Sequence, residues 1–161
     1  YCYVCAWEKD GRTFVVSLLG CGWPNHKTYK WSDTKKLLSY GSYNYNYETY
    51  WQEPQTEKIL VADGVEGSQD IGTLVYLRGK CSVTADDRNK KILLKKGESV
   101  ICQTEIPPKV SAPVLKGEKL GRIAYYLNGE LIDSYPVYAE KSVEKISFKW
   151  YVEKVFHGFF H

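Results

Sequence analysis

The chain has 161 residues, of which 43% are apolar, so it can bury a real core and is not a disordered polypeptide. Its 14 Tyr, 5 Trp and 5 Phe favour strands over a helical bundle, because aromatic side chains pack well on a pleated surface. The net charge is only +3 and is spread along the sequence, so we expect no nucleic-acid partner.

The composition predicts a mainly β protein with short helices. The chain contains no Met and opens inside an apolar stretch, so we expect that further polypeptide precedes Tyr1. It shows no secretory signal and no apolar run long enough to span a bilayer. The compartment therefore cannot be read from targeting signals in this stretch.

Residues 1–19 predict a β-hairpin. Residues 1–7 show the alternation of a strand, residues 8–11 (Glu-Lys-Asp-Gly) form a turn, and residues 13–19 are an apolar run that ends at Gly20. Because the second run is continuously apolar, we expect that strand to be buried.

A short helix is predicted over residues 32–41. The side chain of Ser32 or Asp33 can accept hydrogen bonds from the free N–H groups of the first turn, and Gly41 can end the helix in the left-handed conformation. The apolar face of this helix comprises Trp31, Leu37, Leu38 and Tyr40.

Beyond a boundary near Glu53 and Pro54, the pattern changes to short β-prone runs separated by Gly, Asp, Asn and Pro. Regular spacing of this kind predicts a small β-sandwich. Its clearest hairpin turns at Asn128-Gly129, since both residues tolerate the positive φ angles of a type I′ turn. The expected strands cover residues 58–62, 72–77, 81–84, 92–94, 99–106, 120–127 and 131–138.

Residues 141–161 show a helical period with an apolar and a basic face, which predicts an amphipathic helix. The segment is too charged to span a bilayer, but it can lie on an anionic membrane surface. The alternative is a helix packed on the sandwich. The apolar positions are Val143, Ile146, Trp150, Tyr151, Val155, Phe156 and Phe159, and the interleaved lysines are Lys141, Lys145, Lys149 and Lys154.

The five cysteines do not have the paired spacing of a zinc site. We expect buried free thiols, with a disulfide between Cys81 and Cys102 as the alternative. His157 and His161 are too isolated to indicate a metal site, and we expect neither a metal nor another cofactor.

Three segments, taken in order, resemble penicillin-binding D-Ala-D-Ala carboxypeptidases: Val-Val-Ser-Leu-Leu-Gly at residues 15–20, the helix of residues 32–41, and Ser-Ala-Pro-Val-Leu-Lys-Gly-Glu-Lys-Leu-Gly at residues 111–121. The resemblance covers nearly the whole chain and depends on order and spacing. It implies three parts. These are the tail of a catalytic domain (residues 1–46), a β-sandwich accessory domain (47–140) and an amphipathic membrane-associating segment (141–161).

The resemblance also implies a function. Members of this family acylate an active-site Ser with the penultimate D-Ala of a peptidoglycan stem peptide and then hydrolyse the ester, at the outer face of the bacterial cytoplasmic membrane. The implied partners are the stem peptide, the N-terminal catalytic portion and an anionic membrane surface.

Short matches to the catalytic motifs of that family occur in the chain, and we interpret them as chance. Residues 32–35 and 142–145 fit Ser-x-x-Lys, and residues 42–44 fit Ser-x-Asn. With 11 Ser and 18 Lys, about one Ser-x-x-Lys match is expected at random. No Lys-Thr-Gly or Lys-Ser-Gly occurs in the sequence, so we expect the true motifs before Tyr1 and no catalytic residue in this chain.

Lys30 is the one candidate for substrate binding. Many members of the family carry an Arg just before the helix, facing the terminal carboxylate of the substrate, and Lys30 holds the nearest position. A Lys offers a point charge rather than a two-pronged fork, which weakens the correspondence. The alternative is a solvated loop lysine, and His26 in the same loop is expected at the surface.

Two functional hypotheses remain. In the first, the chain is part of a serine carboxypeptidase and has no turnover alone, and its hairpin (residues 1–19) self-associates because its sheet is incomplete. In the second, it is a free-standing sandwich that binds wall glycans through its Tyr and Trp side chains. Catalytic motifs just before Tyr1 would support the first hypothesis, and an unrelated linker there would support the second.

Overall fold

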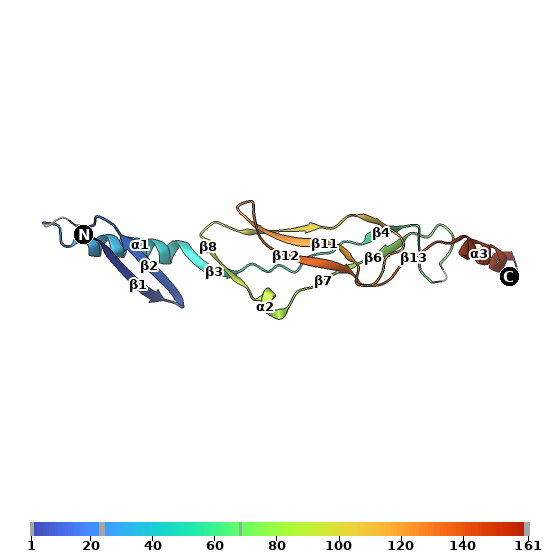
Figure 1. Ribbon diagram of the computed structural model, residues 1–161, viewed down its shortest axis with the longest axis horizontal. Coiled ribbons are helices and arrows are strands. Elements are labelled where there is room, and N and C mark those ends of the chain that lie inside the picture. Colours follow the sequence, from blue (N-terminus) through green and yellow to red (C-terminus); the bar gives the residue numbers. More distant parts are fainter. Residues whose placement is uncertain (1, 23–24, 68, 160–161) are drawn as a thin grey trace. The chain divides into compact units, whose positions relative to one another are not determined.

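The computed structural model describes residues 2–22, 25–67 and 69–159 (Figure 1). Strands predominate and the helices are few, so the predicted fold class, mainly β with short helices, is confirmed. The chain divides into two compact units, which are Tyr1–Thr49 with Lys91–Glu98 and Tyr50–Lys90 with Ser99–His161.

The first unit opens with an antiparallel hairpin of β1 (Tyr3–Lys9) and β2 (Arg12–Leu18). Its turn residues Asp10 and Gly11 have φ angles of 51° and 70°, the positive values that a type I′ turn requires. The predicted hairpin is therefore confirmed.

The expectation that β2 is buried is wrong for one of its faces. Val16 is buried, whereas its neighbour Val15 is 70% exposed. β1 and β2 form a two-stranded sheet within the described part of the chain, and the next helix packs on β2. One face of the hairpin is therefore covered, and the alternate side chains meet solvent.

That helix, α1 (Tyr29–Asn44), is longer at both ends than the predicted helix of residues 32–41. Thr28 occupies the N-cap position and makes no side-chain cap bond. Ser32 and Asp33 therefore lie inside the helix, and the prediction that one of them caps it is wrong.

The C-terminal end of α1 depends on packing and on Arg12 rather than on a glycine cap. The helix runs through Gly41, where a Cβ would lie 3.0 Å from Cδ1 of Phe14, so the glycine permits close approach to the hairpin. The Arg12 guanidinium donates hydrogen bonds to the carbonyls of Ser42 and Tyr45. A cation here complements the helix dipole and satisfies carbonyls that lack helical partners.

β3 (Tyr45–Thr49) follows α1 directly and pairs antiparallel with β8 (Lys91–Lys95). The strand predicted at residues 92–94 is thus confirmed, but its ladder partner lies in the first unit and not in the sandwich. Sequence spacing could not show this, because the run resembles the sandwich strands on either side of it.

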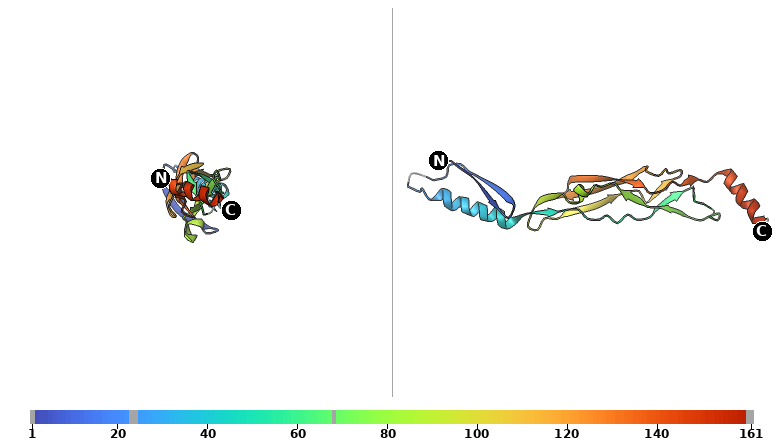
Figure 2. Two further views of the ribbon diagram at one scale, coloured as in Figure 1. Left: turned by 90° about the vertical axis from the view of Figure 1, so that its right-hand side faces the viewer. Right: turned by 90° about the horizontal axis from the view of Figure 1, so that it is seen from below.

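The second unit contains two sheets and one short strand pair (Figures 1 and 2). The larger sheet is antiparallel, in the order β7-β12-β11-β9. The smaller has the order β10-β4-β6, with β10 parallel to β4, and β5 pairs with β13. The strands are β4 (Ile59–Ala62), β5 (Gly64–Val65), β6 (Val75–Leu77), β7 (Gly79–Cys81), β9 (Val100–Glu105), β10 (Lys109–Ser111), β11 (Lys119–Leu127), β12 (Glu130–Ala139) and β13 (Glu144–Lys145), and a single-turn helix, α2 (Ala85–Arg88), follows β7.

The core of this unit is aliphatic, with an aromatic cluster beside it. Tyr125 is completely buried, and its ring contacts Tyr50, Trp51 and Tyr135 at centroid distances of 5.4 to 6.0 Å. Part of the aromatic content noted in the sequence therefore serves packing in this unit. The aliphatic core consists of Ile59, Val61, Val75, Leu77, Ala112, Val114, Leu120, Ala139 and Val143.

The β11–β12 hairpin agrees with its prediction. Asn128 and Gly129 form the turn with φ angles of 53° and 83°. Both values are positive, as a type I′ turn requires.

The predicted helix over residues 141–161 is wrong in its first third, because α3 spans Phe148–Phe159. Val143 is only 1% exposed, belongs to the aliphatic core, and forms a bridge with Val114. Lys145 lies in β13, which pairs with β5. An apolar residue that faces a core looks the same in a sequence as one on an amphipathic helix.

The described cysteines are free thiols, but the expectation that they are buried is wrong. Cys2 is exposed, and Cys5, Cys21, Cys81 and Cys102 are half-buried. Burial raises the pKa of the Cys81 thiol, which keeps it protonated and unreactive near neutral pH.

Candidate functional site

Lys30 lies in the first turn of α1 rather than in the loop before it. Its Nζ atom is 5.0 Å from the ring centroid of Trp31 and 5.9 Å from that of Tyr3. These two rings meet edge to face at 5.2 Å. The ammonium group is thus held over an aromatic pair that joins α1 to β1, an arrangement that orients a cation and leaves it able to receive an anion.

His26 is exposed and stacks on Tyr29, with ring centroids 4.5 Å apart. This places it at the surface, where the sequence led us to expect it. His161 lies outside the described residues, as do the side chains of His157 and Phe159. Among the described residues, no group of three or more His, Cys, Asp or Glu could hold a metal ion.

The serines and the asparagine of the chance motif matches in α1 have local structural roles. Ser32 Oγ donates to the carbonyl of Tyr29 at 3.0 Å, and Ser42 Oγ donates to that of Ser39 at 3.2 Å. Asn44 Nδ2 donates to the carbonyl of Tyr40 at 2.8 Å. Each bond returns to the helix itself, which is a common fate of short polar side chains in helices.

Ser142 also has a structural partner, since its Oγ accepts a hydrogen bond from the backbone N–H of Lys116 at 2.9 Å. The segment from Ser142 to Lys145 is not helical. A catalytic Ser-x-x-Lys pair needs a helix to bring the two side chains onto one face, whereas residues three apart in an extended chain point to opposite faces. The Ser-x-x-Lys spacing therefore does not bring the side chains of Ser142 and Lys145 together.

The densest polar cluster of the second unit centres on Asp133, and the sequence did not reveal it. Asp133 Oδ2 accepts hydrogen bonds from the hydroxyls of Tyr50 and Tyr135, both at 2.8 Å, and from Lys90 Nζ at 3.0 Å. Lys90 also pairs with Asp87 Oδ1 at 2.9 Å. Tyr50, Lys90 and Asp133 are far apart in sequence, so only the fold brings these three together.

The electrostatics of this cluster favour fixed charges. Partial burial opposes ionisation of Asp133, but the hydrogen bonds from Tyr50, Tyr135 and Lys90 outweigh it and lower its pKa. Hydrogen bonds from Lys90 and Thr84 lower the pKa of Asp87 to about 2. Lys90 has a raised pKa because it is bound to both carboxylates, Asp87 first. A lysine held in this way is a structural cation and not a general base.

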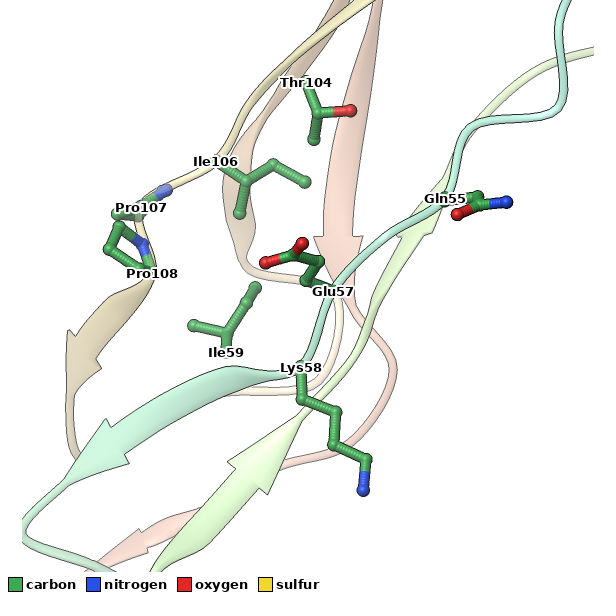
Figure 3. A pocket seen from close by; sticks show the side chains of 8 residues that line it. All are labelled: Gln55, Glu57, Lys58, Ile59, Thr104, Ile106, Pro107 and Pro108. Atoms are coloured by element: carbon green, nitrogen blue, oxygen red, sulfur yellow. The ribbon is translucent and has the colours of Figure 1, made fainter.

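A cavity of about 350 Å³ lies between the segment before β4 and the segment after β9 (Figure 3). The side chains of Ile59 and Ile106 form its apolar part, and Glu57 is the only carboxylate in its lining. None of its eight lining residues is Ser, Cys or His, so the lining does not supply the serine nucleophile that an acyl-transfer site of this kind needs. The remaining lining residues are Gln55, Lys58, Thr104, Pro107 and Pro108.

Comparison with known proteins identifies the family. A family model described as the C-terminal domain of penicillin-binding protein 5 matches residues 55–145, more than half of the chain. The chain belongs to this family. The matched range begins just before β4 and ends with β13, so the penicillin-binding protein 5 C-terminal domain family accounts for the strands of the second unit.

Relatives extend the similarity beyond that domain. The D-alanyl-D-alanine carboxypeptidase DacF of Bacillus subtilis is 22% identical over 158 residues, covering 96% of this chain and 36% of the relative. The chain therefore spans about a third of the length of that protein. The resemblance of the sequence to the C-terminal portion of penicillin-binding D-Ala-D-Ala carboxypeptidases is thereby confirmed.

Two solved structures are also similar to the chain. The D-alanyl-D-alanine carboxypeptidase DacD from Francisella tularensis is 20% identical, with a TM-score of 0.42 over 91% of this chain and 33% of that chain. Penicillin-binding protein 5 from Haemophilus influenzae is 21% identical, with a TM-score of 0.37 over 90% and 39%.

Proposed function

We propose that the chain is the C-terminal part of a serine-type D-Ala-D-Ala carboxypeptidase that trims peptidoglycan stem peptides. The observation that carries this proposal is the family match at residues 55–145, together with similarity to a carboxypeptidase along 96% of the chain. The reaction needs a nucleophilic Ser, a Lys one helical turn later and a strand that binds the substrate. These groups belong to the portion before Tyr1.

The local roles of Ser32, Ser42 and Ser142 support this division of labour, because each hydroxyl is engaged with backbone. In the intact enzyme, the second unit positions the catalytic part near its peptidoglycan substrate, and the first unit completes the catalytic domain. Lys30 then supplies a positive charge for the terminal carboxylate of the stem peptide.

A peptidase assay tests this proposal. The product of the complete gene should release D-Ala from a peptide that ends in D-Ala-D-Ala, and the 161-residue chain should release none. Release of D-Ala by the chain alone would overturn the division of labour, and inactivity of the complete product would overturn the proposed reaction.

We propose further that the protein works outside the cytoplasm and that α3 rests on an anionic membrane surface. Phe148, Val155 and Phe156 are exposed apolar side chains on a helix that also carries Lys149 and Lys154. Such a helix can bury its apolar side at the headgroup level. Within the described residues, no helix is both long and apolar enough to cross a membrane.

Vesicle sedimentation tests the role of α3. A chain ending at Ser147 removes the helix and keeps the buried Val143, so the core of the second unit remains intact. The full chain should bind phosphatidylglycerol vesicles and the shortened chain should not. Equal binding by both would contradict the proposal.

The aromatic cluster of the second unit gives the glycan-binding alternative no specific support. Tyr50, Tyr125 and Tyr135 are buried against one another and against Trp51. A sugar platform needs exposed ring faces, whereas these rings pack on each other.

A further inference from the structure

Four exposed apolar or aromatic side chains of the second unit lie on the β5–β6 loop and on the first turn of α3. They are Ile71, Leu74, Phe148 and Tyr151, which we call the apolar tip. Phe148 is 84% exposed, Leu74 63% and Ile71 52%, so these side chains contribute little to the core. Two of the four lie in the loop between β5 and β6, and two lie in the first turn of α3.

The pairings of β13 with β5 and of β4 with β6 bring these two segments together. Glu144 pairs with Val65, and the backbone N–H of Ile146 donates to the carbonyl of Asp63 at 2.8 Å, so the chain enters α3 beside the connection between β4 and β5. Val61 pairs with Val75, which brings the end of the β5–β6 loop close to the same connection. β13 and β6 lie at the same end of the unit in Figure 1.

A shallow groove of about 300 Å³ joins the loop to the helix. Thr73 and Leu74 line it from the loop, and Trp150 and Tyr151 line it from α3. Ile71 lies in a turn between the lining residues Asp70 and Gly72. Leu74 and Tyr151 of the apolar tip thus line one groove.

We infer that residues 69–74 enter the lipid headgroup region together with α3, so that the membrane-binding surface is composite. This inference rests on the proposed membrane role of α3. The loop residues Gln69 to Leu74 form no ladder hydrogen bonds, so their side chains can enter lipid without disturbing a sheet. Tyr151 and Trp150 belong to the residue types that settle at a membrane interface.

The loop and α3 differ in charge, so their contributions to membrane binding should respond differently to salt. α3 offers Lys149 and Lys154 to anionic lipid, whereas the loop carries the acidic Asp70 next to Ile71. The helix therefore contributes through salt-sensitive attraction, and the loop contributes through apolar burial, which salt does not screen.

The test measures binding of the full chain to vesicles of equal parts phosphatidylglycerol and phosphatidylcholine, at low and at high salt. Ile71→Ser with Leu74→Ser should weaken binding about tenfold at both salt concentrations, since two partly inserted side chains are lost. Ile71→Trp should strengthen binding several-fold, because an indole is favoured at the membrane interface. The control is Ile101→Ser with Leu131→Ser, which alters exposed apolar residues on β9 and β12 and should bind as the wild type does.

The outcomes are distinct. If the chain ending at Ser147 loses binding while Ile71→Ser with Leu74→Ser keeps it, the loop has no role and the α3 anchor still stands. If the full chain does not bind vesicles, both the anchor and this inference fail. If the loop variant instead reduces self-association measured without vesicles, the apolar tip is a protein contact and the inference is overturned.

Discussion

At the scale of single residues, the Asp133 cluster shows how the second unit is tied together. Tyr50 precedes the sandwich strands, Lys90 follows α2, and Asp133 lies on β12. One carboxylate therefore joins three segments that are distant in sequence. Because its donors include a cation and partly buried hydroxyls, removal of its charge should cost more than removal of a surface charge.

Asp133→Asn should lower the free energy of unfolding by about 1–2 kcal/mol, because Lys90 and two hydroxyls lose a charged acceptor. Urea unfolding followed by circular dichroism measures this change. Glu130→Gln, at an exposed position of the same strand, is the control and should change stability by less than about 0.5 kcal/mol. Equal effects of the two substitutions would refute the role of the cluster.

The same cluster predicts a pH dependence. The folded pKa of Asp87 is about 2, below its ordinary value of 3.8, and the pKa of Asp133 is also lowered. Their stabilising effect is therefore fully present above the ordinary value and is lost as the pH falls toward 2. Thermal unfolding between pH 5 and pH 2 should show a steeper loss in the wild type than in Asp87→Asn with Asp133→Asn, and parallel curves would contradict the assignment.

The proposed role of Lys30 is to bind the terminal carboxylate of the substrate. In the complete enzyme, Lys30→Ala should lower kcat/KM for a D-Ala-D-Ala peptide about tenfold and affect acylation by penicillin less. Lys30→Arg should retain activity, since a guanidinium also binds carboxylate and stacks on Trp31. Lys27→Ala, an exposed lysine just before α1, is the control. Unchanged peptide kinetics in Lys30→Ala would return Lys30 to the alternative of a solvated surface lysine.

At the scale of elements, two glycines show where strand and helix packing leave no space. A Cβ at Gly121 would collide with the backbone carbonyl of Glu105 in the neighbouring strand, which cannot move without breaking the β9–β11 ladder. A Cβ at Gly41 would instead meet the ring of Phe14 at 3.0 Å. A ring can shift, and Ala gains about 1 kcal/mol over Gly in a helix.

Gly121→Ala should therefore destabilise the protein by about 2 kcal/mol or more, and Gly41→Ala by clearly less. Chemical unfolding of both variants compares them directly. Near-native stability of Gly121→Ala would mean that the distance between β9 and β11 at this position is larger than the structure shows.

Both hairpins could be predicted from the sequence because their turn residues, Asp10-Gly11 and Asn128-Gly129, dictate local geometry. The limits of α1 could not be predicted from the sequence. Gly41 lies inside the helix and allows close contact with Phe14, and this contact joins residues that are distant in sequence. The same reason explains why Val143 was assigned to a helix. Its partner Val114 is brought to it by the fold.

The candidate site divides in the same way. The sequence points to Lys30 because it stands in a recognisable order of elements, and its role in substrate binding stays a prediction. Its aromatic support by Tyr3, and the Asp133 cluster, could not be found, because both join residues that are brought together only by the fold.

At the scale of the molecule, the hairpin of the first unit bears on assembly. Val4 and Val15 are exposed on the face of the hairpin that α1 does not cover. An uncovered apolar sheet face with free edges recruits partners, so we predict that the isolated chain self-associates through it. Val4→Lys with Val15→Lys should shift sedimentation to the monomer, whereas Ile101→Lys on β9 should not. A wild-type chain that is strictly monomeric would contradict the prediction.

The family match over residues 55–145 agrees with the order of segments from which the sequence pointed to this family. Covalent labelling tests the proposed reaction directly.

The most direct test of the central claim is acylation by a fluorescent penicillin, with the modified residue located by mass spectrometry. The product of the complete gene should be labelled once, on a serine before Tyr1, and the 161-residue chain should remain unlabelled. Labelling of the chain at Ser32 or Ser142, or no labelling of the complete product, would contradict the account.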